Sequence, residues 1–121
     1  MLTDASKPLY EVKANLFKGL AHPARIRVLE LLSGAEEVSV AELIAETGLE
    51  ASNLSQHLGV LKKFHLVVAE RRGSLVYYRL AHAEVAELLT VARALLGAVL
   101  ADSRDRLALA EGLPAVAGTT R

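Results

Sequence analysis

The sequence predicts a mainly α-helical domain with a small β-hairpin, on the strength of three observations. Apolar residues recur every three or four positions near both ends of the chain, as they do in amphipathic helices. Two shorter helical patterns meet at Gly48 in the middle of the chain. After them, β-rich runs at 67–69 and 75–80 flank Gly73 and Ser74, a pattern typical of a hairpin.

The length of 121 residues fits one domain. We expect a flexible arm at 1–8, the folded domain at 9–110 and a disordered tail at 111–121. The formal net charge is zero, so the overall charge does not favour nucleic acid. The absence of cysteine excludes disulfides and thiolate metal sites. Because neither a signal pattern nor an uncharged run of about 18 apolar residues occurs, we expect a cytoplasmic protein without a membrane partner.

The first two helices are predicted at 9–20 and from Pro23 to about Ser33. Pro23 separates them, because proline restricts the residue before it and suits the first turn of a helix. His22 is expected to cap the second helix rather than to bind a metal. That second helix is apolar over much of its circumference, which places it in the centre of the core.

Residues 39–64 predict two short helices joined by a tight turn. Ser39 and Glu42 have the spacing of a capping box. Gly48 can adopt the positive φ that ends a helix, and Ser52 is expected to cap a second helix that reaches about Phe64. Helix, short glycine turn and helix together form the helix-turn-helix pattern.

The second of these helices has two different faces. Leu54, Leu58 and Leu61 fall on one narrow stripe that should point inward. The opposite face is small, polar and partly basic, and it consists of Ser52, Ser55, Gln56, Gly59 and Lys63. Hydroxyl, amide and ammonium groups can meet base edges and phosphates in the major groove of DNA. An ordinary helical hairpin with a solvated face is the alternative.

Charge is distributed unevenly along this part of the chain. Residues 35–50 hold five acidic side chains and no basic one. Residues 51–80 hold five basic side chains and one acidic, which is a local net charge of +4. Arg71 and Arg72 approach the hairpin turn, so the hairpin is predicted to be a wing that contacts flanking phosphates or the minor groove. Alternatively, these arginines are solvent charges on an exposed strand edge.

A long helix is predicted from His82. Its apolar seam is nearly unbroken, and about 20 residues would extend about 30 Å. Because the first two helices already cover the core, we expect part of the seam to contact a second copy of the chain. The predicted dimer interface consists of Leu88, Leu89, Ala92, Leu95, Leu96 and Val99. Alternatively, the helix covers only its own domain.

Three segments together resemble the ArsR/SmtB family of bacterial winged-helix repressors. They are LAHPARIRVLELL at 20–32, SVAELIAETGLEASNLSQHLGVLKKFHLV at 39–67 and ERRGSLVYYRL at 70–80. The resemblance covers roughly residues 9–100. It implies a winged helix-turn-helix of order α-α-α-α-β-β-α that is dimeric through its first and last helices. It also implies a repressor that occupies an operator, in the bacterial nucleoid, until an effector weakens DNA binding.

By this resemblance, base reading falls to Ser52, Ser55 and Gln56, joined by Ala51 and His57, while Arg71 and Arg72 contact DNA from the wing. His57 also lies near the edge of the inward stripe, so packing and phosphate contact suit it equally. Lysines at the end of the helix are expected to contact phosphates. The full predicted DNA-binding set is Ala51, Ser52, Ser55, Gln56, His57, Lys62, Lys63, Arg71 and Arg72.

The effector sites of the family are not reproduced in full. Residues 38–40 read Val-Ser-Val where arsenic and lead sensors have Cys-x-Cys. At the interfacial metal site of the last helix, His82 and Glu84 match the first pair of ligands, whereas Leu95 and Ala98 stand at the second. A variant site for nickel, zinc or cobalt, built on His82 and Glu84 with other histidines or carboxylates, stays open. So does a purely structural role for His82 in the first turn.

The sequence therefore predicts a homodimeric, sequence-specific DNA-binding repressor that responds to an effector. A divalent metal is the first candidate effector and a small organic ligand the second. The alternative is a winged-helix interaction module that acts with a separate co-regulator protein. An enzyme is not expected, because no nucleophile–base pair, phosphate-binding loop or carboxylate pair stands out.

Overall fold

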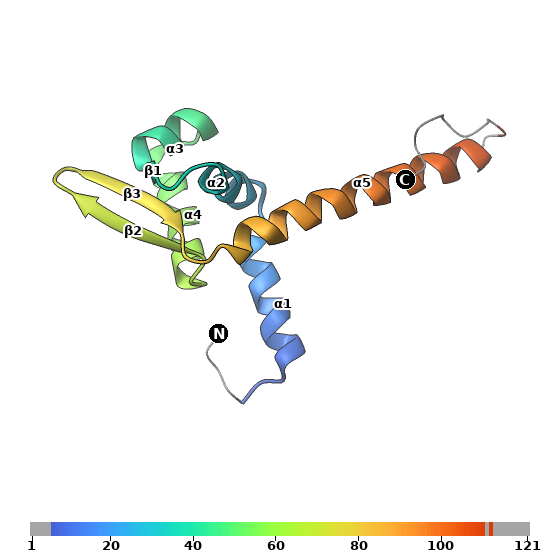
Figure 1. Cartoon of the computed structure of the whole chain (residues 1–121), viewed down its shortest axis with the longest axis horizontal. Coiled ribbons are helices and arrows are strands. Elements are labelled where there is room, and N and C mark those ends of the chain that lie inside the picture. Colours follow the sequence, from blue (N-terminus) through green and yellow to red (C-terminus); the bar gives the residue numbers. More distant parts are fainter. Residues whose placement is uncertain (1–5, 111, 113–121) are drawn as a thin grey trace. The chain divides into compact units, whose positions relative to one another are not determined.

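The computed structural model describes residues 6–110 and 112. Its elements are α1 (Leu9–Leu20), α2 (Pro23–Ser33), β1 (Val38–Ser39), α3 (Val40–Thr47), α4 (Ala51–Lys63), β2 (Val67–Arg72), β3 (Leu75–Leu80) and α5 (Glu84–Ala110), shown in Figure 1. The predicted mainly α-helical fold with a small hairpin is confirmed. The chain divides into two compact units, one ending at Ala86 and one beginning at Glu87. Most of the predicted arm and tail lies outside the described residues.

The junction between α1 and α2, at residues 21–23, is formed as the sequence predicts. His22 is extended and caps α2, its ring Nδ1 accepting a hydrogen bond from the Ala24 backbone N–H at 3.0 Å. Val28, Leu29 and Leu32 of α2 are almost fully buried. Because α2 contacts α3, α4 and β3, it is the central helix of the core, as expected.

The two middle helices form the predicted helix-turn-helix. Ser39 and Glu42 make both hydrogen bonds of the capping box, each at 3.1 Å. Gly48 ends α3 with a φ of 71°, a conformation that favours glycine. The prediction that Ser52 caps the next helix is wrong. Helical bonding already starts at the carbonyl of Glu50, which accepts from the Leu54 N–H, so Glu50 is the N-cap and Ser52 lies inside the first turn.

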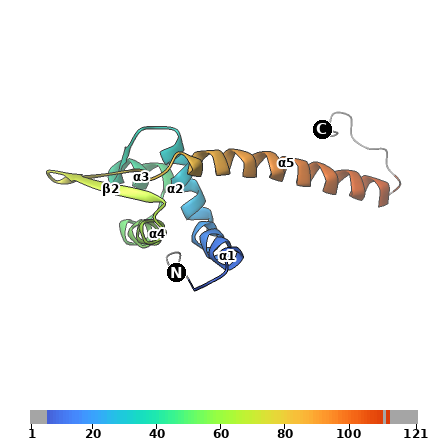
Figure 2. The ribbon, with the colours of Figure 1, turned by 60° about the horizontal axis from the view of Figure 1, so that its bottom comes forward.

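The hairpin belongs to a three-stranded antiparallel sheet in the order β1-β3-β2. β2 and β3 pair along their whole length and leave the predicted Gly73–Ser74 turn. Figure 2 shows the hairpin with α4 on one side of it, where α4 contacts β2. The structure adds β1, which places Val38 opposite Tyr78. Two residues are too few to show the period-two pattern from which strands are predicted.

The chain leaves α4 through a Schellman motif. The His65 N–H donates to the Lys62 carbonyl at 2.9 Å, and the Leu66 N–H donates to the Leu61 carbonyl at 3.0 Å. His65 has a φ of 61°, at a position where glycine is usual. The motif reverses the chain within two residues, so that the buried Val67 begins β2 directly.

α5 is a continuous helix of 27 residues that begins at Glu84, two residues later than predicted. Along the part that belongs to the second unit, large apolar side chains are exposed; they include Val91, Leu95, Leu96, Val99 and Leu100. Among the described residues, no helix combines the length and apolarity needed to span a membrane.

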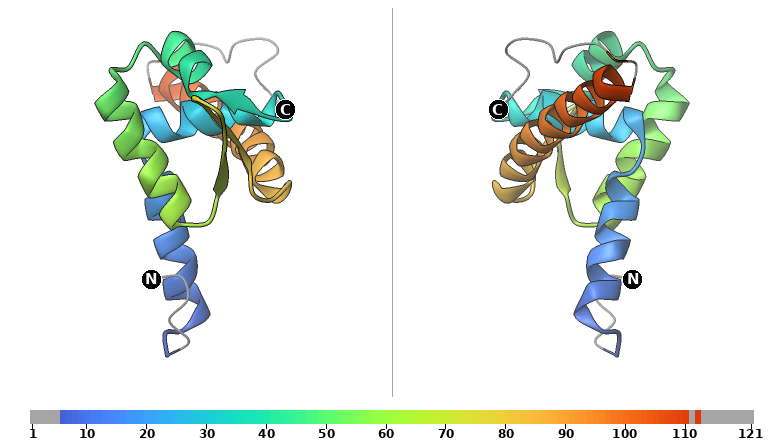
Figure 3. Two further views of the ribbon diagram at one scale, coloured as in Figure 1. Left: turned by 90° about the vertical axis from the view of Figure 1, so that its left-hand side faces the viewer. Right: turned by 90° about the vertical axis from the view of Figure 1, so that its right-hand side faces the viewer.

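α1 approaches the end of α4 closely at Gly19 (Figure 3). A Cβ atom added to Gly19 would lie 2.8 Å from Cγ of the Phe64 ring, and Gly19 itself is buried. Real Cβ atoms do not come so near to other carbon atoms. Glycine at this position therefore sets the spacing between α1 and α4.

Gly19→Ala should destabilise the protein. Overpacking against Phe64 typically costs about 1–3 kcal/mol, of which the better helix propensity of alanine recovers up to about 1 kcal/mol. Gly59→Ala is the matched control, because no atom lies within 4 Å of a Cβ built there. It should stabilise the protein. Urea unfolding followed by circular dichroism measures both changes, and equal stabilisation by the two variants would show that α1 and α4 do not pack as described.

Candidate nucleic-acid interface

The inward stripe of α4 is buried and its outer face is exposed. Leu54, Leu58 and Leu61 are at most 3% exposed, which confirms their predicted orientation. The predicted outer face is exposed at all its members, Ser52, Ser55, Gln56, Gly59 and Lys63, and the predicted DNA-binding residues Ala51 and Lys62 are exposed as well. Gln56, Gly59, Val60, Lys62 and Lys63 line an open hollow on this surface. Buried leucines thus hold α4 in place while its polar side chains remain unobstructed.

Asn53 is an exposed residue of the first turn that the sequence analysis left out. It lies three positions before Gln56, so the two amide side chains are neighbours on the helix surface. Amide side chains can bond adenine with two hydrogen bonds in the major groove. The i, i+3 spacing of two amides is the sequence signal that would have included Asn53.

His57 lies away from this outer face. It is half-buried, and its ring centroid is 4.3 Å from that of His22. Its Nδ1 is 3.4 Å from Nη1 of Arg25. Of the predicted DNA-binding residues on α4, His57 is therefore the one that lies beside the junction between α1 and α2.

Arg25 joins α1 to α4, a role that the sequence analysis missed. Its Nε donates to the Gly19 carbonyl at 2.7 Å and its Nη2 to the Lys18 carbonyl at 3.3 Å. Those carbonyls lie in the last turn of α1, where backbone acceptors lack helical partners. Arg25 lies within the segment 20–32 that carries the family resemblance, but spacing alone does not show which distant residue an arginine reaches.

The environment of His57 disfavours its charged form. Burial lowers the pKa of His57 most, and the neighbouring His22 and Arg25 lower it further. Arg25 can only donate a hydrogen bond, so a contact with Nδ1 requires an unprotonated nitrogen there. The direction of the pKa shift and the contact geometry therefore agree on a neutral His57.

Arg72 of the wing forms hydrogen bonds with two carboxylates and lies against an aromatic ring of the same chain. Its guanidinium donates to both carboxylate oxygens of Glu37, one of them at 2.7 Å, and to Glu70 at 3.3 Å. It also lies 4.5 Å from the centre of the Tyr77 ring. The hydrogen bonds from Arg72 are the main cause of a lowered pKa at Glu37 and Glu70, and they raise the pKa of Arg72 itself.

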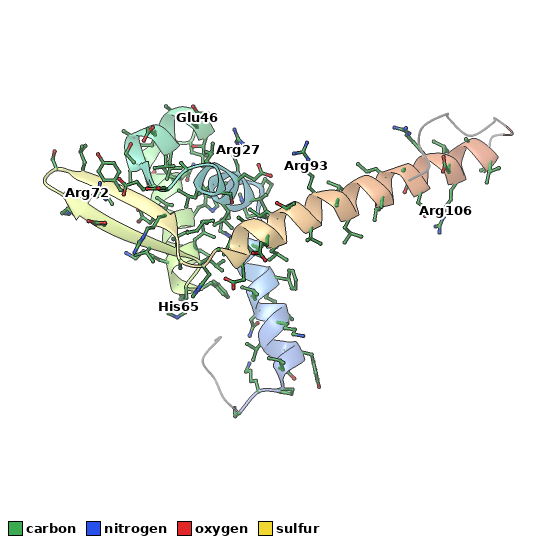
Figure 4. All side chains as sticks on the ribbon, viewed as in Figure 1. Arg27, Glu46, His65, Arg72, Arg93 and Arg106 are labelled. Atoms are coloured by element: carbon green, nitrogen blue, oxygen red, sulfur yellow. The ribbon has the colours of Figure 1, made fainter. Side chains whose placement is uncertain are left out.

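Arg71 has a different environment from Arg72. Successive residues of a strand point to opposite faces, so Arg71 does not share the face that carries Glu70 and Arg72. Its side chain is exposed, and within residues 6–110 and 112 no ion pair of Arg71 is observed. Figure 4 shows Arg72 on the hairpin and His65 where α4 leads into it. Of the two wing arginines, Arg71 is the one whose charge has no carboxylate partner in the described part of the chain.

The predicted metal ligands do not form a site within one chain. His82 and Glu84 are both exposed at the start of α5. In the described part of the chain, no three His, Cys, Asp or Glu side chains are grouped closely enough to hold a metal ion. The described residues of one chain therefore do not supply the three or four grouped side-chain ligands that a zinc site requires.

Comparison with known proteins gives consistent matches. A helix-turn-helix domain family model matches residues 20–71. The HTH-type transcriptional regulator Rv0081 of Mycobacterium tuberculosis is 51% identical over 116 residues, which cover 95% of this chain and 98% of that protein. The crystal structure of Rv0081 has a TM-score of 0.74 at 53% identity and covers 80% of this chain and 97% of its own.

Two further solved structures are similar. The transcriptional repressor BigR from Xylella fastidiosa has a TM-score of 0.66 at 36% identity, covering 78% of this chain and 95% of that one. The homodimeric winged helix-turn-helix DNA-binding domain Mb0332 from Mycobacterium bovis, a possible ArsR-family regulator, has a TM-score of 0.67 at 32% identity, covering 78% and 86%. Rv0081 and BigR are a transcriptional regulator and a transcriptional repressor, the class of protein that the sequence predicts.

The stability of the protein should depend on the protonation of His57. Because the pKa of His57 is lowered in the folded chain, the unfolded chain binds its proton at a higher pH. The free energy of unfolding should therefore fall as the pH drops below about 6.5, the ordinary histidine value, and level off below the lowered pKa. Urea unfolding between neutral and mildly acidic pH measures this loss. His57→Asn should lose less stability over the same range, and equal losses would contradict the assignment.

Proposed function

Because this chain belongs to the ArsR/SmtB family of winged helix-turn-helix transcriptional regulators, we propose that it is a homodimeric repressor that recognises a specific operator sequence. The observation that carries the proposal is the exposed polar face of α4, held outward by buried leucines. A helix of this kind fits the major groove, where each base pair presents a distinct set of donors and acceptors.

Base reading is assigned to the first half of α4. Ser52, Ser55 and Gln56 are exposed there with no acidic neighbour on the helix, and their hydroxyl and amide groups can bond base edges. Ala51 and Asn53 flank them. Lys62 and Lys63 in the last turn are assigned to phosphates, which fix the position of the helix on the duplex.

The wing contact is assigned to Arg71 first. Its exposed guanidinium can neutralise a phosphate or enter the minor groove without losing another partner. Arg72, which was also expected to contact DNA, would first have to exchange Glu37 for a phosphate. Its pairing with Glu37 and Glu70 instead suits a residue that fixes the orientation of the wing.

Three alanine substitutions separate these roles. Gln56→Ala should reduce discrimination at one base pair by about 1–3 kcal/mol, whereas Arg71→Ala should weaken binding to all duplexes and reduce the salt slope by about 1. Arg72→Ala should change the slope less. The measurement is fluorescence anisotropy over a series of salt concentrations, with a duplex that the wild-type protein selects from a random pool and a scrambled duplex.

Arg27→Ala is the control for charge, because Arg27 lies on α2 and pairs with Glu30. It should leave the slope unchanged. Failure of the wild-type protein to select any duplex would contradict the proposal and favour the alternative, a module that binds a co-regulator protein. Protein binding need not weaken steeply with salt, whereas DNA binding must, because counterions are released.

The dimer is assigned to the apolar face of α5, with a contribution from α1. Leu95 is 62% exposed and Val99 50%, and on α1 Tyr10 and Phe17 are also exposed. Leaving such surface in water costs about 25 cal/mol per Å² of apolar area, which a second copy would recover by covering it. Two copies would present two α4 helices to successive major-groove turns.

Leu95→Glu should convert the dimer into a monomer, because two charges would be buried in one symmetric interface. Ala94→Glu is the matched control, since Ala94 is exposed on the other side of the helix. Sedimentation equilibrium gives the mass in solution. If Leu95→Glu keeps the mass of two chains, the interface lies elsewhere. The same conclusion follows if Ala94→Glu dissociates the dimer.

A metal effector is not part of this proposal. His82 and Glu84 would need ligands from a second copy, and the positions that supply them in the family hold Leu95 and Ala98. Within the described residues of one chain no ligand group compensates for this loss. An organic ligand or a sensing partner protein is therefore the better class of effector to seek.

A further inference from the structure

We propose that Arg25 and His57 are positioning residues for α4, which set DNA specificity without touching DNA. They do so by connecting the middle of α4 to the last turn of α1 through hydrogen bonds. The inference rests on the proposed function, because it needs α4 to read the operator. It assigns to His57 a role other than base reading, and it gives Arg25 a part in recognition.

The geometry of Arg25 carries the first step. Three of its nitrogens reach three different atoms: Nε the Gly19 carbonyl, Nη2 the Lys18 carbonyl and Nη1 the His57 ring. The guanidinium is planar and its donors have fixed directions. Once the two carbonyls of α1 are bonded, the location of Nη1 is determined, and so is the place where His57 must lie.

The His57 ring is held from a second direction. His22 lies against it, with an angle of 41° between the ring planes. His22 in turn is fixed to the start of α2, because its Nδ1 accepts from the Ala24 N–H. The ring of His57 therefore contacts Arg25, which bonds the last carbonyls of α1, and His22, which caps α2.

Directional contacts of this kind supply what the leucines of α4 cannot. Burial of Leu54, Leu58 and Leu61 is non-directional and tolerates small rotations of the helix. A hydrogen bond weakens steeply with angle and distance. His57 directly follows Gln56, so any rotation of α4 that breaks the contact with Arg25 also moves the Gln56 amide. Accurate base reading consequently depends on the bond between Arg25 and His57.

The opposing interpretation is that Arg25 and His57 simply contact phosphate. The two roles respond differently to conservative substitution. Arg25→Lys keeps the charge but cannot bond two carbonyls and a ring at fixed angles. His57→Asn keeps an acceptor near the position of Nδ1, whereas His57→Phe keeps the ring but has no acceptor.

The test measures, for the full-length chain, the ratio of dissociation constants for the scrambled and selected duplexes defined above. Arg25→Lys and His57→Phe should each reduce this ratio several-fold, because each removes the 3.4 Å contact between Nη1 of Arg25 and the His57 ring. The affinity for the scrambled duplex and the salt slope should not change. His57→Asn should keep a ratio close to that of the wild type, and reselection with it should return the same sequence.

Retention of the wild-type ratio by Arg25→Lys would overturn the inference, as would a changed preferred sequence for His57→Asn. Equal losses on both duplexes with a flatter salt slope would identify phosphate contacts instead. Circular dichroism checks folding, and if His57→Phe does not fold, Arg25→Lys decides the question alone. If the wild-type protein selects no duplex, the proposed function fails, and this inference fails with it. Each of the other results concerns the inference only.

Discussion

The burial of the α4 leucine stripe against the core is the constraint on which the rest of the structure depends. Leu54 and Leu61 are fully buried, as are Val28 and Leu29 of α2. Because this apolar contact buries one side of α4, the polar side faces the solvent. The same helix then fixes the base of the wing, since its Schellman turn leads into β2 within two residues. Core packing, the candidate reading surface and the wing are thus consequences of one amphipathic helix.

Electrostatics refines this arrangement in a way that net charge does not reveal. The acidic block at 35–50 and the basic block at 51–80 look separate in the sequence, yet Glu37 of one and Arg72 of the other are paired. The pair lowers the effective charge of the wing while it links the segment before β1 to the end of β2 across the intervening β3. Among the described residues, the exposed basic side chains of this segment without an observed ion pair are Arg71, Arg79 and the lysines in the last turn of α4. Local charge counts therefore overstate the basic surface and miss its geometry.

The sequence was sufficient for most of the features whose determining interaction is local. The capping box of α3, the φ of Gly48, the cap by His22 and the hairpin turn depend on residues two to four apart, and all were predicted. Ser52 was misplaced because several polar residues near it could have been the cap. The contacts that link Arg25 to His57 and Arg72 to Glu37 span 32 and 35 residues. Only the folded chain brings such residues together, so neither propensity nor periodicity contains them.

The division of α4 into two faces also bears on how such proteins can diverge. Exposed positions such as Ser52, Ser55 and Gln56 carry little of the folding energy, because surface substitutions usually change stability by no more than about 0.5 kcal/mol. A duplicated copy of the gene could therefore acquire a new operator preference through these positions while its core stays intact. His57 is an exception, because it lies between the surface and the core. The exposed residues assigned to base reading can therefore change during evolution more freely than His57, the residue that positions α4.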